Sequence, residues 1–87
     1  MSRYSFGAHM AAQLTPAQRR AISYIGRCRG RVARYGKGQP ISTRTFNALS
    51  AKRLVMENGP GRVMLTWNGE LVFTALHPKS KYAIKKG

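Results

Sequence analysis

Residues that could perform acid–base or metal chemistry are scarce in this chain. Among its 87 residues, Glu57 and Glu70 are the only carboxylates, because Asp is absent. A glycosidase-type carboxylate pair or a carboxylate-held magnesium ion therefore has two candidates at most. Cys28 is the single cysteine, which excludes an intrachain disulfide and a cysteine-based zinc cluster. We expect no enzymatic activity, no metal and no cofactor.

Nucleophilic catalysis would require the Cys28 thiol with His9 or His77 as its base. Cys28 falls on the apolar stripe of a predicted helix, where a buried and inert thiol is the more common arrangement. Neither histidine has a second metal-ligating residue near it in the sequence. We therefore interpret these three residues as structural.

Positive charge dominates the sequence. Sixteen Lys and Arg against two Glu give a net charge of +14. A typical solvated surface interleaves both signs, whereas one stretch of nineteen residues holds seven cations and no acidic residue. This pattern predicts contacts with a polyanion, and nucleic acid is the commonest one. The candidate phosphate contacts are Arg19, Arg20, Arg27, Arg29, Arg31, Arg34 and Lys37, with Lys52, Lys79 and Lys81 elsewhere in the chain.

Length and hydropathy indicate one small soluble domain. Hydrophobic residues make up 43% of the chain, enough for a core. The longest uncharged apolar run, 71–76, is far shorter than the ~20 residues of a membrane-spanning helix. The first thirteen residues lack the apolar stretch of a secretory signal. We expect a cytoplasmic, nucleoid-associated protein with no membrane partner.

Two helices are predicted by their start signals. Thr15 is a good N-cap, Pro16 suits the first helical position and Gln18 occupies the capping-box position. Apolar residues at helical spacing follow, which predicts a helix over 16–28. Ser42 is the N-cap expected for a second helix over 43–53.

Turn residues separate the extended segments. The glycines of 36–38 predict a strand, a turn and an extended return over 31–41, with a short helix at 31–35 as the alternative. Apolar runs at 54–57 and 62–66 flank Asn58-Gly59-Pro60-Gly61 and predict a β-hairpin. Thr66 is the N-cap expected for a last helix, which Pro78 stops after residue 76.

These elements define three segments. Residues 1–13 show little periodicity and are expected to form a flexible leader. Within it, GAHM at 7–10 resembles the remnant of a cleaved expression tag, so part of the leader need not be native. Residues 14–76 form the domain, and 77–87 form a basic C-terminal tail, expected to be an arm.

The order of helix, short extended piece, helix, hairpin and helix resembles a winged helix-turn-helix domain of the small bacterial or phage transcription-regulator type. The opening helix of such regulators is similar to LTPAQ at 14–18, and their recognition helix to ISTRTFNALSAKRLV at 41–55. The second wing strand and the following helix start are similar to VMLTWNGE at 63–70. The resemblance implies an α+β fold with about three helices and a C-terminal two-stranded wing.

The sequence departs from that family at two places. The family often has a Gly where the recognition helix passes into the wing, because the chain turns there in a left-handed conformation. Arg53 holds that position here, and we expect an exit that either differs from the family's or carries some strain. The usual middle helix is replaced by 31–41, whose composition is more typical of the strand and turn, a possible extra hairpin.

The resemblance assigns the helix 43–53 to the DNA major groove. Arg44 can donate two hydrogen bonds to guanine, and Asn47 can pair with adenine on the same helix face. Thr43 and Ser50 are candidates for phosphate contacts, as are the free N–H groups at the start of the helix, and Ser42 is counted among the DNA-binding residues of the same helix. Arg62, beside the hairpin turn, would reach a minor groove. The alternatives are an ordinary solvated helix face and a plain hairpin.

Aromatic and methionine residues are assigned mainly to packing. Trp67 and Tyr24 are expected at the edge of the core, and Met56 and Met64 on the inward side of the wing. Tyr35 could instead stack on a nucleotide.

We therefore expect a sequence-preferring double-stranded DNA-binding protein, a small transcription regulator or a phage or plasmid accessory factor. Structured-RNA or ribosome-associated binding is one alternative, because a charge of +14 would be ordinary there. A protein–protein adaptor or host-directed inhibitor on a winged-helix scaffold is another. The sequence leaves a homodimer open.

Overall fold

A computed structural model describes residues 3–28 and 33–84. Within these residues the protein is an α+β domain with four helices and a three-stranded antiparallel sheet. The helices predicted to follow Thr15, Ser42 and Thr66, and the predicted β-hairpin, are confirmed with ends that shift by two residues at most. The elements are α1 (Arg3–Gln13), α2 (Pro16–Arg27), β1 (Ala33–Arg34), α3 (Thr43–Ala51), β2 (Val55–Glu57), β3 (Arg62–Leu65) and α4 (Trp67–Leu76).

Side-chain caps fix where the helices begin. Thr15 Oγ1 accepts from the Gln18 backbone N–H at 3.2 Å, and the Gln18 side chain accepts from the Thr15 N–H at 3.1 Å, which completes the capping box. Ser42 caps α3 and Thr66 caps α4 in the same way, each accepting a backbone N–H three residues ahead.

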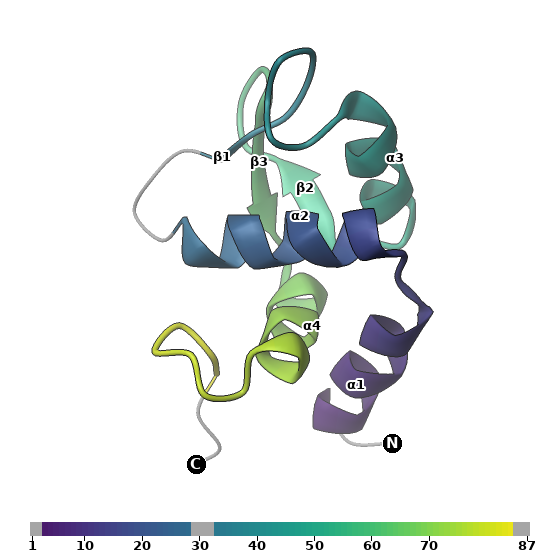
Figure 1. The fold of residues 1–87 in the computed structure, drawn as a ribbon, viewed down its shortest axis with the longest axis vertical. Helices are drawn as coiled ribbons and strands as arrows, with labels where there is room; N and C mark the ends of the chain where they lie inside the picture. The colour runs from purple at the N-terminus through teal and green to yellow at the C-terminus, as the bar shows by residue number, and fades with distance from the viewer. Residues whose placement is uncertain (1–2, 29–32, 85–87) are drawn as a thin grey trace.

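The sheet has the order β1-β3-β2, and one face of it is buried. Val55 lies opposite Leu65, and Ala33 opposite Val63, with all four side chains in the core. Helices α2 and α3 pack against this face. In Figure 1, α2 crosses the middle of the molecule, with the sheet and α3 above it and α1, α4 and the C-terminal segment below. The largest fully buried side chains are Phe73, Ile22, Ile41, Leu49, Leu54 and Val72.

The expectation of a flexible leader over 1–13 is wrong for the described residues. Residues 3–13 form α1, which packs along α4 (Figure 1). Ala11 is 8% exposed and belongs to the core. Gly7 is buried so close to α4 that a Cβ on it would collide with the Leu71 carbonyl oxygen. The GAHM tetrapeptide therefore forms part of a packed helix.

Arg19 of α2 adds a side-chain cap to the C-terminal end of α1, where the Leu14 N–H already donates to the Ala11 carbonyl at 3.3 Å. Its guanidinium donates to the carbonyl oxygens of Ala11 and Ala12, at 3.2 and 3.4 Å. These carbonyls are among the last four of the helix, which have no partner within it. The last turn of α1 holds no basic residue, so the positive charge at this helix end is that of Arg19 from α2.

The segment 31–41 differs from its prediction in part. A strand forms at Ala33–Arg34, which rules out a helix there, but it pairs with β3 and not with a returning strand. Ile41 makes only an isolated parallel bridge to Tyr35, in which the Gly36 N–H donates to the Ile41 carbonyl at 2.8 Å. The expected extra strand therefore forms as β1, but the extra hairpin does not, because the return at Ile41 meets Tyr35 in a parallel bridge and not as an antiparallel strand. Residues 31 and 32 lie outside the described range.

Residues 77–84 fold back against α4, so the part of the expected basic arm that the structure describes is packed on the domain. The Ile84 N–H donates to Thr74 Oγ1 at 2.9 Å, and Tyr82 packs against the core. Two turn hydrogen bonds, from Ser80 to the His77 carbonyl and from Ala83 to the Ser80 carbonyl, shape the return.

Candidate nucleic-acid interface

The exposed side of α3 carries the residues predicted to read bases. Phe46 and Leu49 are buried, whereas Arg44 and Asn47 are exposed on the opposite side of the helix. Thr43 and Ser50 are exposed with them. Ser42 is also exposed, but its hydroxyl group is engaged with Thr45, whose N–H it accepts and whose Oγ1 it donates to at 3.0 Å. The helix can therefore present hydrogen-bonding side chains to a groove.

The outer face of the sheet carries two arginines directly opposite each other. The register of β1 and β3 pairs Arg34 with Arg62, and the alternating residues Ala33 and Val63 point into the core. Like charges at opposed positions on one face destabilise a sheet. Glu57 is opposite Val63, so its carboxylate belongs to the other face. Within the described strands, the outer face therefore holds this cationic pair and no carboxylate.

Met56 and Met64 share that outer face, which corrects the expectation that they pack inward. They are cross-strand partners, 48% and 41% exposed. Because side chains alternate along a strand, burying Val55 and Leu65 turns the two methionines outward. Trp67, expected at the edge of the core, is 53% exposed at the start of α4.

Three segments meet at one end of the molecule. The hairpin turn at 58–61, the loop at 36–42 and the N-terminal end of α3 lie together at the top of Figure 1. Arg62 follows the hairpin turn directly and Lys37 is exposed in the loop. Arg44 lies in the first turn of α3. We use the name upper surface for the exposed side of α3, the hairpin turn and the 36–42 loop, together with the cations Arg34, Lys37, Arg44 and Arg62.

Tyr35 ties the parts of the upper surface together. Its ring stacks on Phe46 of α3 at 3.8 Å between centroids and 3° between planes. Its hydroxyl group donates to Glu57 Oε2 of β2 at 2.5 Å. This hydrogen bond is the main reason why the pKa of Tyr35 is raised above 10.0. The ring considered for nucleotide stacking thus stacks within the protein and fixes α3 beside the hairpin.

The other predicted phosphate contacts are not part of the upper surface. Arg19, Arg20 and Arg27 lie on α2 around a hollow of about 380 Å³, which Leu76 and His77 complete. Lys52 is at the C-cap of α3, where its positive charge interacts favourably with the negative end of the helix dipole. Lys79 and Lys81 lie in the segment that returns along α4, at the opposite end from the hairpin turn. Arg29 and Arg31 fall outside the described residues.

The histidines and the cysteine contact neighbours that sequence reasoning did not foresee. His77 Nε2 is 2.6 Å from Ser23 Oγ, and His9 Nε2 is 2.9 Å from Gln13 Nε2. Burial, and then the adjacent Cys28, raise the pKa of Tyr24. In the part of the chain that the structure describes, no group of three or more His, Cys, Asp or Glu side chains converges on a point where a metal ion could bind.

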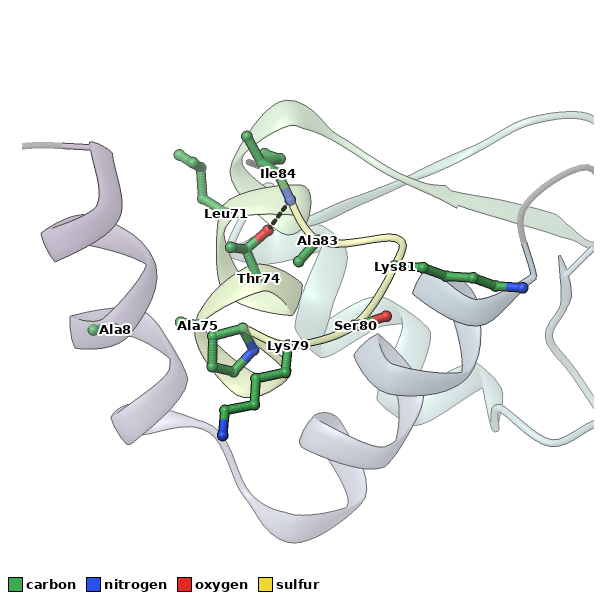
Figure 2. A pocket seen from close by; sticks show the side chains of 10 residues that line it. Ala8, Leu71, Thr74, Ala75, Lys79, Ser80, Lys81, Ala83 and Ile84 are labelled. Carbon is green, nitrogen blue, oxygen red and sulfur yellow. Dashed lines mark hydrogen bonds between the residues drawn. The ribbon is translucent and has the colours of Figure 1, made fainter. Parts of the chain in front are cut away.

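A larger cavity of about 710 Å³ lies at the other end of the molecule, between α1, α4 and the returning segment. Figure 2 shows its walls, which are mostly apolar. It contains none of the residues predicted to bind nucleic acid except Lys79 and Lys81.

Comparison with models of known protein families, with curated proteins and with solved structures gives no match for this chain. Across the described residues, no helix has both the length and the apolar character needed to cross a membrane.

Proposed function

We propose that this protein binds double-stranded DNA through the upper surface, with α3 in the major groove and the β2–β3 hairpin beside it as a wing. The observation that carries the proposal is the opposed pair Arg34 and Arg62 on the outer face of the sheet, whose hairpin turn lies at the same end of the molecule as the first turn of α3 (Figure 1). Two arginines at opposed positions cost free energy in the isolated protein. A phosphate backbone lying along them would replace this repulsion with attraction.

Each part of the surface has a role in the proposed complex. Arg44 donates to guanine O6 and N7, and Asn47 pairs with adenine. Thr43, Ser50 and the backbone N–H groups at the start of α3 contact phosphates, which sets the register of the helix on the duplex. Arg34, Lys37 and Arg62 bind the backbone that flanks the groove. The affinity then comes largely from phosphates and the sequence preference from two side chains.

The winged-helix arrangement is part of this proposal. The hairpin follows α3 directly along the chain, as the resemblance requires, and Tyr35 holds the two together. A loop over 36–42 stands where the family has its middle helix. The biological role that this proposal implies is that of a transcription regulator or a phage or plasmid accessory factor.

A charge-matched pair of double variants tests the surface. Arg34→Gln with Arg62→Gln removes two cations from the outer sheet face, and Arg20→Gln with Arg27→Gln removes two from α2. Binding to a fluorescent 20-base-pair duplex is measured by anisotropy over a series of salt concentrations. We expect the first variant to reduce the log–log salt slope by about 2, and the second to leave it close to that of the parent protein.

Equal losses in the two variants would show that only net charge matters, and the assignment of the surface would fall. An RNA hairpin of equal length serves as competitor. Preferential displacement of the duplex by that hairpin would favour the RNA-binding alternative, because RNA binders recognise loops and the A-form minor groove.

A further inference from the structure

The cavity at the lower end of the molecule has the form of a small-molecule site. Its volume of about 710 Å³ lies within the range of roughly 300–1,000 Å³ that is typical of ligand pockets. One wall is α1 at Ala8, the floor is α4 and the far wall is the returning segment. The lining consists of Ala8, Leu71, Thr74, Ala75, Pro78, Lys79, Ser80, Lys81, Ala83 and Ile84.

The walls are apolar and the ionisable groups are all cationic. Leu71, Ala75, Pro78 and Ile84 supply the apolar part of the lining, although Leu71 is only 4% exposed. The Thr74 hydroxyl group is engaged at the back of the cavity, where it accepts from the Ile84 N–H. Among the described lining residues there is no carboxylate. A ligand that matches this lining has an apolar body and is either neutral or negatively charged.

The two lysines of the lining are not equivalent. Figure 2 shows the Lys79 side chain directed toward the α1 side of the cavity, whereas Lys81 points away from it. The Lys81 ammonium group lies 5.0 Å from the centre of the Tyr82 ring, a cation–π arrangement. Lys79 is therefore the cation placed to meet a charged group at the mouth of the cavity.

The charge of the protein distinguishes the two candidate occupants of the cavity, a second copy of this chain and an anionic small molecule. A second copy of this chain would bring another +14 toward a cationic rim, which opposes self-association there. An anionic ligand is attracted to the whole molecule and then to Lys79. We infer that this cavity binds a medium-chain carboxylate or a similar anionic amphiphile, with its hydrocarbon against Leu71 and Ile84 and its carboxylate at Lys79. This site is separate from the proposed DNA surface.

Titration of the ¹⁵N-labelled protein with octanoate, at concentrations below micelle formation, tests the inference. We expect saturable amide shifts at Ala8, Leu71, Ala75 and Ile84, with a weaker response to octan-1-ol, which has a similar chain and no charge. Lys79→Ala should weaken octanoate binding about two- to fivefold, the size expected for one solvent-exposed ion pair. Lys52→Ala removes the same charge far from the cavity and should leave the affinity unchanged.

Two substitutions that fill the cavity from opposite walls, Ala8→Phe and Ala83→Phe, should each abolish saturable shifts. Thermal unfolding identifies the folded variants, and saturable shifts that persist in a folded one would overturn the inference. Equal effects of Lys79→Ala and Lys52→Ala, equal binding of the alcohol, or shifts spread over α2 and α3 would overturn the inference. Shifts at the same amides on raising the protein concentration alone would assign the cavity to a second copy and would also overturn it.

Discussion

Arg53 adopts a left-handed backbone conformation, with φ 60°, where α3 passes into β2. Its carbonyl oxygen accepts from Thr66 Oγ1 at 2.6 Å, and the next N–H, of Leu54, donates to the Leu49 carbonyl at 3.1 Å. These bonds fix the angle between α3 and the hairpin. A residue other than glycine in this conformation costs roughly 1–2 kcal/mol. The backbone strain considered at Arg53 is therefore present in the folded protein.

Replacing Arg53 with glycine should relieve that strain. Glycine also gains freedom in the unfolded chain, which offsets about 0.5–1 kcal/mol of the relief. We expect Arg53→Gly to raise the free energy of unfolding by about 0.5–1 kcal/mol in urea titrations. Arg53→Ala loses the same charge and keeps the strain, so it should change the stability little. An equal gain in the alanine variant would trace the effect to charge and contradict the backbone account.

Tyr35 gives a prediction about pH. Its pKa is raised above 10.0 chiefly by the hydrogen bond to Glu57, which the neutral phenol donates. A raised pKa in the folded state means that this contact stabilises the fold fully below the unfolded pKa, near 10, and that its contribution is lost as the pH rises through the folded value. In Glu57→Gln the shift should shrink, as measured by the ultraviolet absorbance of tyrosinate with Tyr35→Phe to assign the signal. An unchanged titration curve would mean that the bond does not form in solution.

At the scale of the elements, sequence reasoning succeeded where the signals are local. Thr15, Ser42 and Thr66 locate three helices, and Asn58-Gly59-Pro60-Gly61 locates the hairpin turn. It failed where the stabilising contacts are distant in sequence. Helix α1 has a glycine in its middle and no basic residue in its last turn, so the local signals for it are weak. It is held by α4 and by Arg19, which sequence analysis assigned to phosphate.

The sequence predicted the residues of the candidate site that lie on α3, but not those that the sheet brings together. The exposed face of α3 follows from helical periodicity, so Arg44 and Asn47 were predictable. The pairing of Arg34 with Arg62 depends on which strand β1 joins, and twenty-eight positions separate the two residues. Only the register shows that they share a face. The outward orientation of Met56 and Met64 depends on the same register and was missed for the same reason.

Gly7 tests whether α1 is an integral part of the fold. In the middle of an isolated helix, replacing glycine with alanine stabilises the helix by roughly 0.5–1 kcal/mol. Here the added Cβ would collide with the Leu71 carbonyl, so we expect Gly7→Ala to lower the free energy of unfolding by at least about 1 kcal/mol. The adjacent residue Ala8 is exposed and lies in the interior of α1, so it provides the control: Ala8→Gly should cost about 1 kcal/mol only if α1 is helical. Stabilisation by Gly7→Ala would show that α1 does not pack on α4 in solution.

On the scale of the whole molecule, the charge is divided between separate regions. The upper surface combines α3, the hairpin turn and the loop 36–42, while α1, α4 and the returning segment enclose an apolar cavity at the other end. Helix α2 lies between them and carries its own arginines. A net charge of +14 would attract DNA to any of these regions. The account of function therefore depends on which region touches the duplex.

The most direct measurement is a map of amide shifts on adding a short DNA duplex to the ¹⁵N-labelled protein at physiological salt. The account predicts that the largest shifts fall on Arg34, Lys37, residues 43–47 and residues 58–64, and that α1, α4 and residues 77–84 change little. Shifts centred on α2 around Arg20 and Arg27, or distributed over all the cationic regions alike, would contradict it.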